Sequence, residues 1–140
     1  MHRRSLGSGR RLAIIGALFV LAGCLLPWYG LGGAEGELSA VEFRAFGGSG
    51  IFAFLAAIAT LALVALPYAA GDHPVPVDRG LIFGLLAITA LVGVTLWVPG
   101  VLARPEGLLP TRAPGFWLAA VGAIVLARAS FEITTERPRR

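Results

Sequence analysis

The sequence of 140 residues contains no Asn, no Gln and no Lys, and charged residues make up only 14% of it. Soluble domains have about 25% charged and about 45–50% apolar residues. Here the hydrophobic share is 56% and the mean hydropathy is +0.79, so too few charges are present to cover a water-facing surface. These values argue against a soluble monomer and predict an integral membrane protein.

Cysteine is nearly absent. A single residue, Cys24, excludes an intramolecular disulfide, a CxxC redox pair and a cysteine-built zinc site. The 12 basic side chains are all Arg, and they flank the apolar segments without forming one basic face. This distribution argues against a nucleic-acid partner, although the formal net charge is +4.

Four stretches without charged residues, 12–34, 45–71, 80–103 and 113–127, are the main structural signal. Within them we predict transmembrane helices over about 12–28, 51–70, 81–98 and 114–131, which suit a hydrocarbon core of about 30 Å. The predicted fold class is all-α, a single membrane domain 1–140 with an up-down bundle of four transmembrane helices. Its connections are an outer loop 29–50, a cytoplasmic loop 71–80 and an outer loop 99–113, with basic tails 1–11 and 132–140.

The arginines predict the orientation of this bundle. With the N-terminus inside, nine arginines fall in inner segments and three in outer segments, so the positive-inside rule favours two cytoplasmic termini. Trp28, Trp97 and Trp117 then fall at the outer ends of their helices, where Trp rings favour the headgroup level. We therefore predict that these three residues are interface anchors of a multi-pass protein of the bacterial inner (plasma) membrane.

Small residues repeat along the predicted helices and mark faces that can pack closely. In 114–131 they occupy every fourth position, at Gly115, Ala119, Ala123 and Ala127. Lipid tails are as apolar as Leu, so close contact at small residues, and not burial alone, drives helices together in a membrane. We expect this stripe to face the bundle, and the alternative is a dimer face. We expect the other stripes to face the bundle as well: Ala53 and Ala57 with Ala62 and Ala65 on a neighbouring row in 51–70, and Gly84, Ala87, Ala90 and Gly93 in 81–98.

The predicted membrane interior has no Asp, Glu, His, Lys, Asn or Gln. Proton relays, ion sites and coupled transporters are normally built from such groups, and no nucleophile–base pair or metal-ligand spacing occurs elsewhere. Thr60, Thr89 and Thr95 are the polar side chains at depth, and we expect each to bond a backbone carbonyl of its own helix. The sequence predicts no catalytic site, no cofactor, no metal and no enzymatic activity.

Residues 21–24 (LAGC) have the form of a lipobox, the cleavage and acylation signal of bacterial lipoproteins. Cleavage there would remove residues 1–23 and place a lipid on Cys24. The residues that follow are still apolar, and three further spans come after them. These features favour the alternative, in which Cys24 is a small packing residue.

Charges near the membrane offer two further sites. Arg128 can extend its stem to the cytoplasmic headgroups or contact an anionic lipid phosphate. The outer loop carries Glu35, Glu37 and Glu42. We expect these carboxylates to keep the loop hydrated at the membrane surface and not to bind a cation. The spacing of Ser39 and Glu42 is that of a capping box and predicts a short helix after Ser39.

The segment 26–29 (LPWY), followed by a glycine-rich loop and 39–46 (SAVEFRAF), resembles a group of uncharacterised small four-span bacterial membrane proteins. Those proteins have a Pro-Trp end to helix one and a Ser-x-x-Glu outer loop. The resemblance covers most of the chain and implies its topology, and it implies no activity.

These inferences together predict a non-enzymatic structural or accessory membrane protein that acts through helix–helix association. Its expected partners are the lipid bilayer and another membrane protein or a second copy, with no nucleic acid and no soluble small-molecule substrate. The alternative is a subunit of a transport system or an oligomeric pore.

Overall fold

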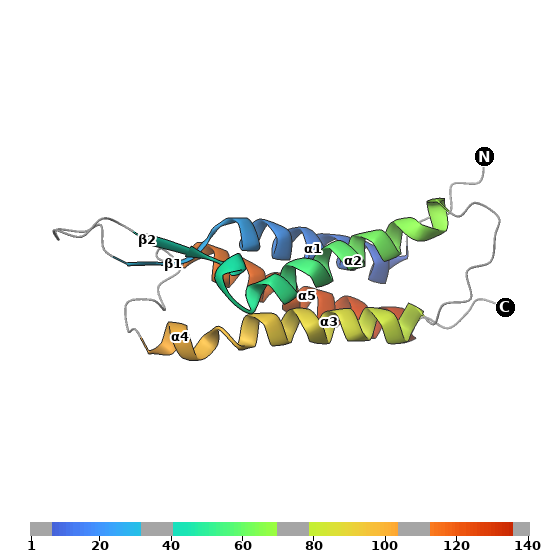
Figure 1. Ribbon diagram of the computed structural model, residues 1–140. Helices are drawn as coiled ribbons and strands as arrows, with labels where there is room; N and C mark the ends of the chain where they lie inside the picture. Colours follow the sequence, from blue (N-terminus) through green and yellow to red (C-terminus); the bar gives the residue numbers. More distant parts are fainter. Residues whose placement is uncertain (1–6, 32–40, 70–78, 104–112, 136–140) are drawn as a thin grey trace.

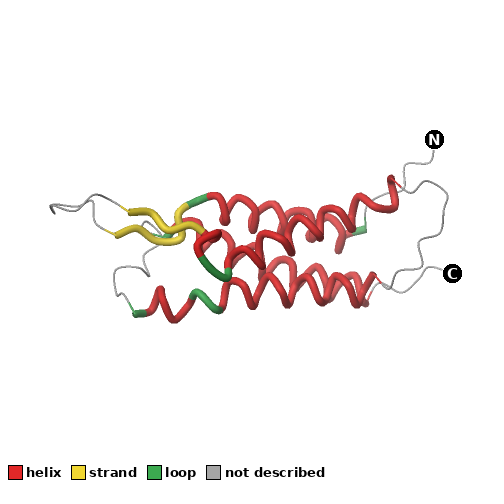
Figure 2. The backbone as a smooth tube through the Cα atoms, in the orientation of Figure 1, coloured by secondary structure: helices red, strands yellow, loops and turns green. Residues whose placement is uncertain are grey.

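The computed structural model describes residues 7–31, 41–69, 79–103 and 113–135. Long helices lie side by side in it, and a two-stranded sheet and a short helix lie together at one end (Figures 1 and 2). We call this end the sheet end. Four segments are long and apolar enough to cross a membrane, as predicted: Ser8–Leu25, Gly50–Ala69, Gly80–Leu102 and Pro114–Thr135. The chain is thus a mostly helical, multi-pass membrane protein.

Helix α1 (Ser8–Leu25) ends earlier than the predicted 12–28 and also begins earlier. Its C-cap residue, Leu26, has extended backbone angles of φ −81° and ψ 159°. The cause is Pro27, whose ring disfavours the helical conformation of the residue before it. Trp28 therefore lies outside the helix on which the sequence analysis placed it.

A second proline divides the third span. Helix α3 (Arg79–Thr95) is followed by a turn and then by the short helix α4 (Val98–Leu102), in place of one helix over 81–98. Pro99 has no N–H to donate, and its ring would clash with the carbonyl of the residue four positions earlier, Thr95. Helix α3 ends at that residue. The two remaining helices, α2 (Gly50–Ala69) and α5 (Pro114–Thr135), begin within one residue of the predicted positions.

The fold contains a sheet that the all-α prediction missed. Strands β1 (Pro27–Leu31) and β2 (Val41–Arg44) pair antiparallel, and a short 3₁₀ helix, η1 (Ala45–Gly47), leads from β2 to α2. The predicted capped helix after Ser39 is wrong, because Glu42 and Phe43 lie in β2. Pairing with β1 satisfies backbone groups that a helix of a few residues would leave largely unpaired.

Helices α1 and α5 make the closest contact in the bundle. Glycines occur at intervals of seven residues on both, and a Cβ atom added at Gly23 would lie 2.5 Å from the backbone nitrogen of Ala119. One added at Gly122 would lie 2.6 Å from the backbone nitrogen of Val20. Seven residues are about two helical turns, so these glycines fall on one face and allow the backbones to approach. The glycines of this contact are Gly9, Gly16 and Gly23 on α1, and Gly115 and Gly122 on α5.

The structure also decides which of the predicted small-residue stripes face inward. On α2, Ala53 and Ala57 are fully buried, whereas Ala62 and Ala65 are exposed. The expectation that the whole α2 stripe faces the bundle is therefore wrong for its second half. On α3, Ala87, Ala90 and Gly93 are buried, and Gly84 is half-buried.

Candidate functional site

The sheet end carries a cluster of aromatic side chains around Trp28. This ring is fully buried, and its centroid lies 5.3 Å from that of Trp97 and 5.7 Å from that of Phe116, both edge to face. Its Nε1 donates a hydrogen bond of 2.9 Å to the backbone oxygen of Gly23. The indole therefore joins the sheet to α1, to the turn after α3 and to α5, with its polar atom satisfied.

An irregularity in the sheet turns Trp28 inward. The register shifts between Pro27 and Tyr29, which pair with Arg44 and Phe43, so that Trp28 has no partner on β2. Such a bulge redirects a side chain relative to the regular alternation of a strand. The rings of Tyr29 and Phe43, opposite each other in the sheet, stack at 4.6 Å with an interplanar angle of 8°.

The three predicted interface anchors therefore differ in their surroundings. Trp28 is corrected from an interface anchor to a core residue, because the bulge places its ring inside the bundle. Trp97 is half-buried, and its ring also lies 5.9 Å from Tyr29. Trp117 is 38% exposed on α5 and retains the surface position that an interface anchor requires.

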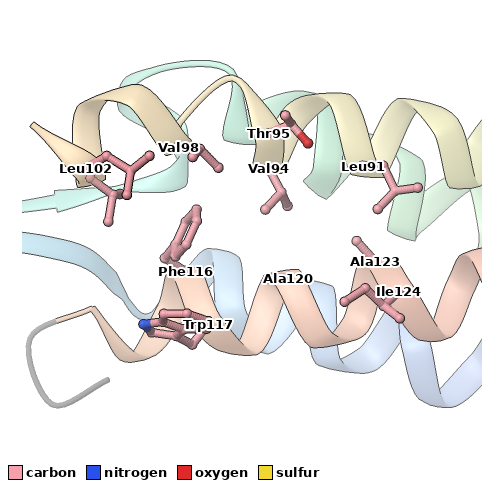
Figure 3. A pocket seen from close by; sticks show the side chains of 11 residues that line it. Leu91, Val94, Thr95, Val98, Leu102, Phe116, Trp117, Ala120, Ala123 and Ile124 are labelled. Atoms are coloured by element: carbon pink, nitrogen blue, oxygen red, sulfur yellow. The ribbon is translucent and has the colours of Figure 1, made fainter. Parts of the chain in front are cut away.

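A cavity lies beside this cluster, between α3 and α4 on one side and α5 on the other (Figure 3). Its volume is about 320 Å³. Its floor is buried, with Val94, Phe116 and Ala123 at most 6% exposed, whereas Leu102 and Ile124 on its rim are 57% and 63% exposed. It is therefore an open groove on the outside of the bundle, and we call it the α3–α5 groove. Its lining side chains are apolar apart from the Thr95 hydroxyl and the indole N–H of Trp117.

Of the predicted packing residues of α5, Gly115 and Ala119 lie against α1 at Gly23, whereas Ala123 lines the floor of the α3–α5 groove. Ala119 and Ala123 are fully buried, Gly115 is buried, and Ala127 is partly buried. A Cβ atom added at Gly115 would lie 2.6 Å from the backbone oxygen of Gly23. Sequence reasoning missed Gly122 and the glycines of α1, although their seven-residue spacing was visible.

Cys24 lies inside the bundle, where α1 approaches the start of α2. It is fully buried, and its Sγ donates to the backbone oxygen of Gly50 at 3.9 Å. The preceding residue, Gly23, packs against the α5 backbone and accepts the Trp28 hydrogen bond. A lipoprotein signal would be cleaved at the peptide bond between Gly23 and Cys24, and this bond is enclosed by α5 and by the sheet end.

Arg128 lies at the far end of α5, and its side chain is 67% exposed. Its Nε lies 3.3 Å from Oε1 of Glu132, one helical turn further along. The second carboxylate oxygen of Glu132 accepts a 3.3 Å hydrogen bond from the Ser8 hydroxyl at the start of α1. Glu132, which the sequence analysis did not single out, thus links the start of α1 to the end of α5.

The threonine hydroxyls within the predicted spans behave as predicted at two positions. Thr60 donates to the backbone oxygen of Ala56 at 2.8 Å, and Thr89 donates to that of Leu85 at 2.9 Å. Both are bonds to the preceding turn of the same helix, which confirms the prediction for these residues. Thr95 lines the groove instead.

Within residues 7–31, 41–69, 79–103 and 113–135, no group of three His, Cys, Asp or Glu residues is arranged to hold a metal ion. Of the predicted acidic loop, Glu42 is exposed on β2, whereas Glu35 and Glu37 lie outside the described residues. In comparisons with known proteins, no family model, no curated protein and no solved structure matches the chain. The resemblance to small four-span bacterial proteins therefore stays a prediction.

Proposed function

We propose that this protein is a non-enzymatic accessory component of a bacterial inner-membrane assembly. In this proposal the four spans form an up-down bundle with both termini in the cytoplasm, and the sheet end lies at the outer surface. The bundle closes on itself through the α1–α5 contact. Partner proteins then contact the outer helix faces and the sheet, and not the small-residue stripe of α5.

The burial of Trp28 is the observation that carries the proposal. The Trp28 ring on β1 is fully buried and hydrogen-bonded to α1, which prevents the strand from moving relative to the helix. The sheet is therefore held at a fixed position relative to the helices, and it presents the exposed Glu42 and Arg44 on β2. A rigid polar element on an apolar bundle is well suited to docking, since little ordering entropy is lost on binding.

The helix contacts support the up-down arrangement. The end of α1 lies against the start of α5 at Gly23 and Gly115, and against the start of α2 at Cys24 and Gly50. The start of α2 in turn lies against the end of α3, where a Cβ atom added at Gly93 would lie 2.8 Å from the Ala53 nitrogen. Contacts between the end of one helix and the start of another are those expected of antiparallel neighbours, and they support the proposed arrangement.

Site-specific photo-crosslinking in the native membrane tests the accessory role. A photoreactive side chain is placed at Glu42 on the sheet, at Ile58 on the outer face of α2, and at Leu18 on the outer face of α1 as a comparison. We expect a discrete protein adduct from at least one of the first two positions. Lipid adducts alone at every position, with the chain recovered as a monomer, would contradict the proposal.

Reconstitution into liposomes separates the proposal from the transport alternative. The purified chain is expected to carry no ion or solute flux, because the predicted membrane interior has no Asp, Glu, His, Lys, Asn or Gln to line a polar pathway. A saturable flux would favour a transport subunit or an oligomeric pore instead.

A further inference from the structure

We propose that the α3–α5 groove binds one acyl chain of a phospholipid from the membrane leaflet at the sheet end. The proposal rests on the membrane location of the helices and not on a partner protein. It therefore adds a specific lipid site to the proposed accessory role.

The groove lies where α3 ends and α4 begins. Because Pro99 ends α3 at Thr95, the chain makes a turn at Leu96 and Trp97 before α4 begins. On the opposite side, α5 presents Ala120 and Ala123, whose short side chains leave the space unfilled (Figure 3). The result is a recess between bulky side chains.

The recess is not suited to water. A buried water molecule needs two to four polar partners, and the lining side chains are apolar apart from the Thr95 hydroxyl and the indole N–H of Trp117. Its volume of about 320 Å³ lies at the low end of the range of roughly 300–1,000 Å³ for ligand pockets. A single flexible hydrocarbon chain matches this chemistry.

The surroundings of the groove identify the source of that chain. Ile124 and Leu102 on the rim are more than half exposed, and so are Leu85 and Ile88 further along α3. These residues belong to the segments Gly80–Leu102 and Pro114–Thr135, which are long and apolar enough to cross a membrane. In this proposal the medium at the groove mouth is therefore lipid. Trp117, part of the lining and 38% exposed, is of the residue type that sits at the headgroup level.

A transmembrane helix fits the groove less well than an acyl chain does. Helices associate in membranes where small residues let their backbones approach, and the glycines of α5 already face α1. The groove mouth is instead edged by Leu102, Trp117 and Ile124. A helix is about 10–12 Å across with its side chains, so these large residues would keep its backbone away from the floor.

Photolabelling of the purified full-length chain tests the site. The chain is reconstituted in phosphatidylglycerol vesicles that contain a phospholipid with a diazirine in its acyl chain, irradiated and digested with trypsin. We expect excess labelling of the tryptic peptide 113–128, which holds the α5 wall, relative to peptide 45–79, which holds α2. We expect the Ala120→Leu variant to lose that excess, because the added side chain fills the recess.

Ala62→Leu is the matched control, since Ala62 is exposed on α2 and away from the groove. It should retain the full excess, and circular dichroism should show that both variants keep the wild-type helix content. Equal labelling of wild type and Ala120→Leu would overturn the proposal. Disulfide-linked dimers of an Ile124→Cys, Cys24→Ser variant that abolish the labelling would also overturn it, in favour of a second copy. The labelling results are independent of the protein cross-links that test the accessory role, so either proposal can fail without the other.

Discussion

At the scale of single residues, glycine decides how the bundle packs. Gly16 and Gly23 on α1 and Gly115 and Gly122 on α5 lie where an added Cβ atom would be 2.5–2.9 Å from a backbone atom of the other helix. Contacts below 3.0 Å force the backbones apart. Gly84 differs, since its Cβ would lie at an ordinary 3.7 Å from the Ser130 hydroxyl.

The difference in space around Gly122 and Gly84 gives a matched pair of alanine variants. Gly122→Ala should destabilise the bundle by about 1–3 kcal/mol, because the new methyl group overpacks against rigid backbone. Gly84→Ala should be neutral or stabilising by up to about 1 kcal/mol, since Ala favours the helix more than Gly does. Unfolding by SDS in detergent micelles, followed by circular dichroism, measures both. Equal stabilities of the two variants would argue against a close α1–α5 contact.

Cys24 gives a second test at this scale. Its burial, and the packing of Gly23 against α5, favour an uncleaved and unacylated chain. We expect the intact mass of the protein purified from its native membrane to be that of the full sequence. A species that begins at residue 24 and carries acyl chains would show that the lipobox is used.

At the scale of elements, the sheet is the part that local sequence signals described least well. The capping-box spacing of Ser39 and Glu42 favoured a helix, but the backbone of 41–44 pairs with 27–31. A short helix can bury little apolar surface and leaves end groups unpaired. Strand pairing also places Phe43 against Tyr29.

Engineered disulfides test this register. In a Cys24→Ser background, Gly30→Cys with Glu42→Cys should cross-link on mild oxidation, because these residues are paired in the sheet and paired Cα atoms lie within disulfide range. Gly30→Cys with Phe43→Cys should not, since a shift of one residue turns the side chain to the other face. Cross-linking of both pairs would show that the segment is mobile.

The anchoring of the sheet is tested by Trp28→Phe. The variant keeps an aromatic ring but leaves the Gly23 carbonyl without its donor, at a cost of about 1–3 kcal/mol. We expect faster hydrogen exchange at the amides of β1 and β2, with α2 unchanged. Phe46→Leu is the control, because Phe46 is 46% exposed. Unchanged exchange in Trp28→Phe would show that other contacts hold the sheet.

At the scale of the whole molecule, the pattern of charge sets the proposed orientation. Single cysteines are introduced at Ser5, Glu37 and Arg139 in a Cys24→Ser background, and intact cells or spheroplasts are treated with a membrane-impermeant maleimide. We expect Glu37→Cys to react and the two terminal positions to react only after the membrane is opened. Labelling of either terminus from outside would reverse or break the four-span topology.

The sequence by itself determined the membrane class and the approximate position of every span, because hydropathy depends on composition within each segment and not on what the segment contacts. It also gave the hydroxyl bonds of Thr60 and Thr89, which are local to one helix. Only the tertiary structure decided which small residues face inward, that Ala62 and Ala65 do not, and that Trp28 turns into the core. These features depend on contacts between distant segments, such as α1 with α5 and β1 with β2, and no local pattern of residues encodes the position of such a partner.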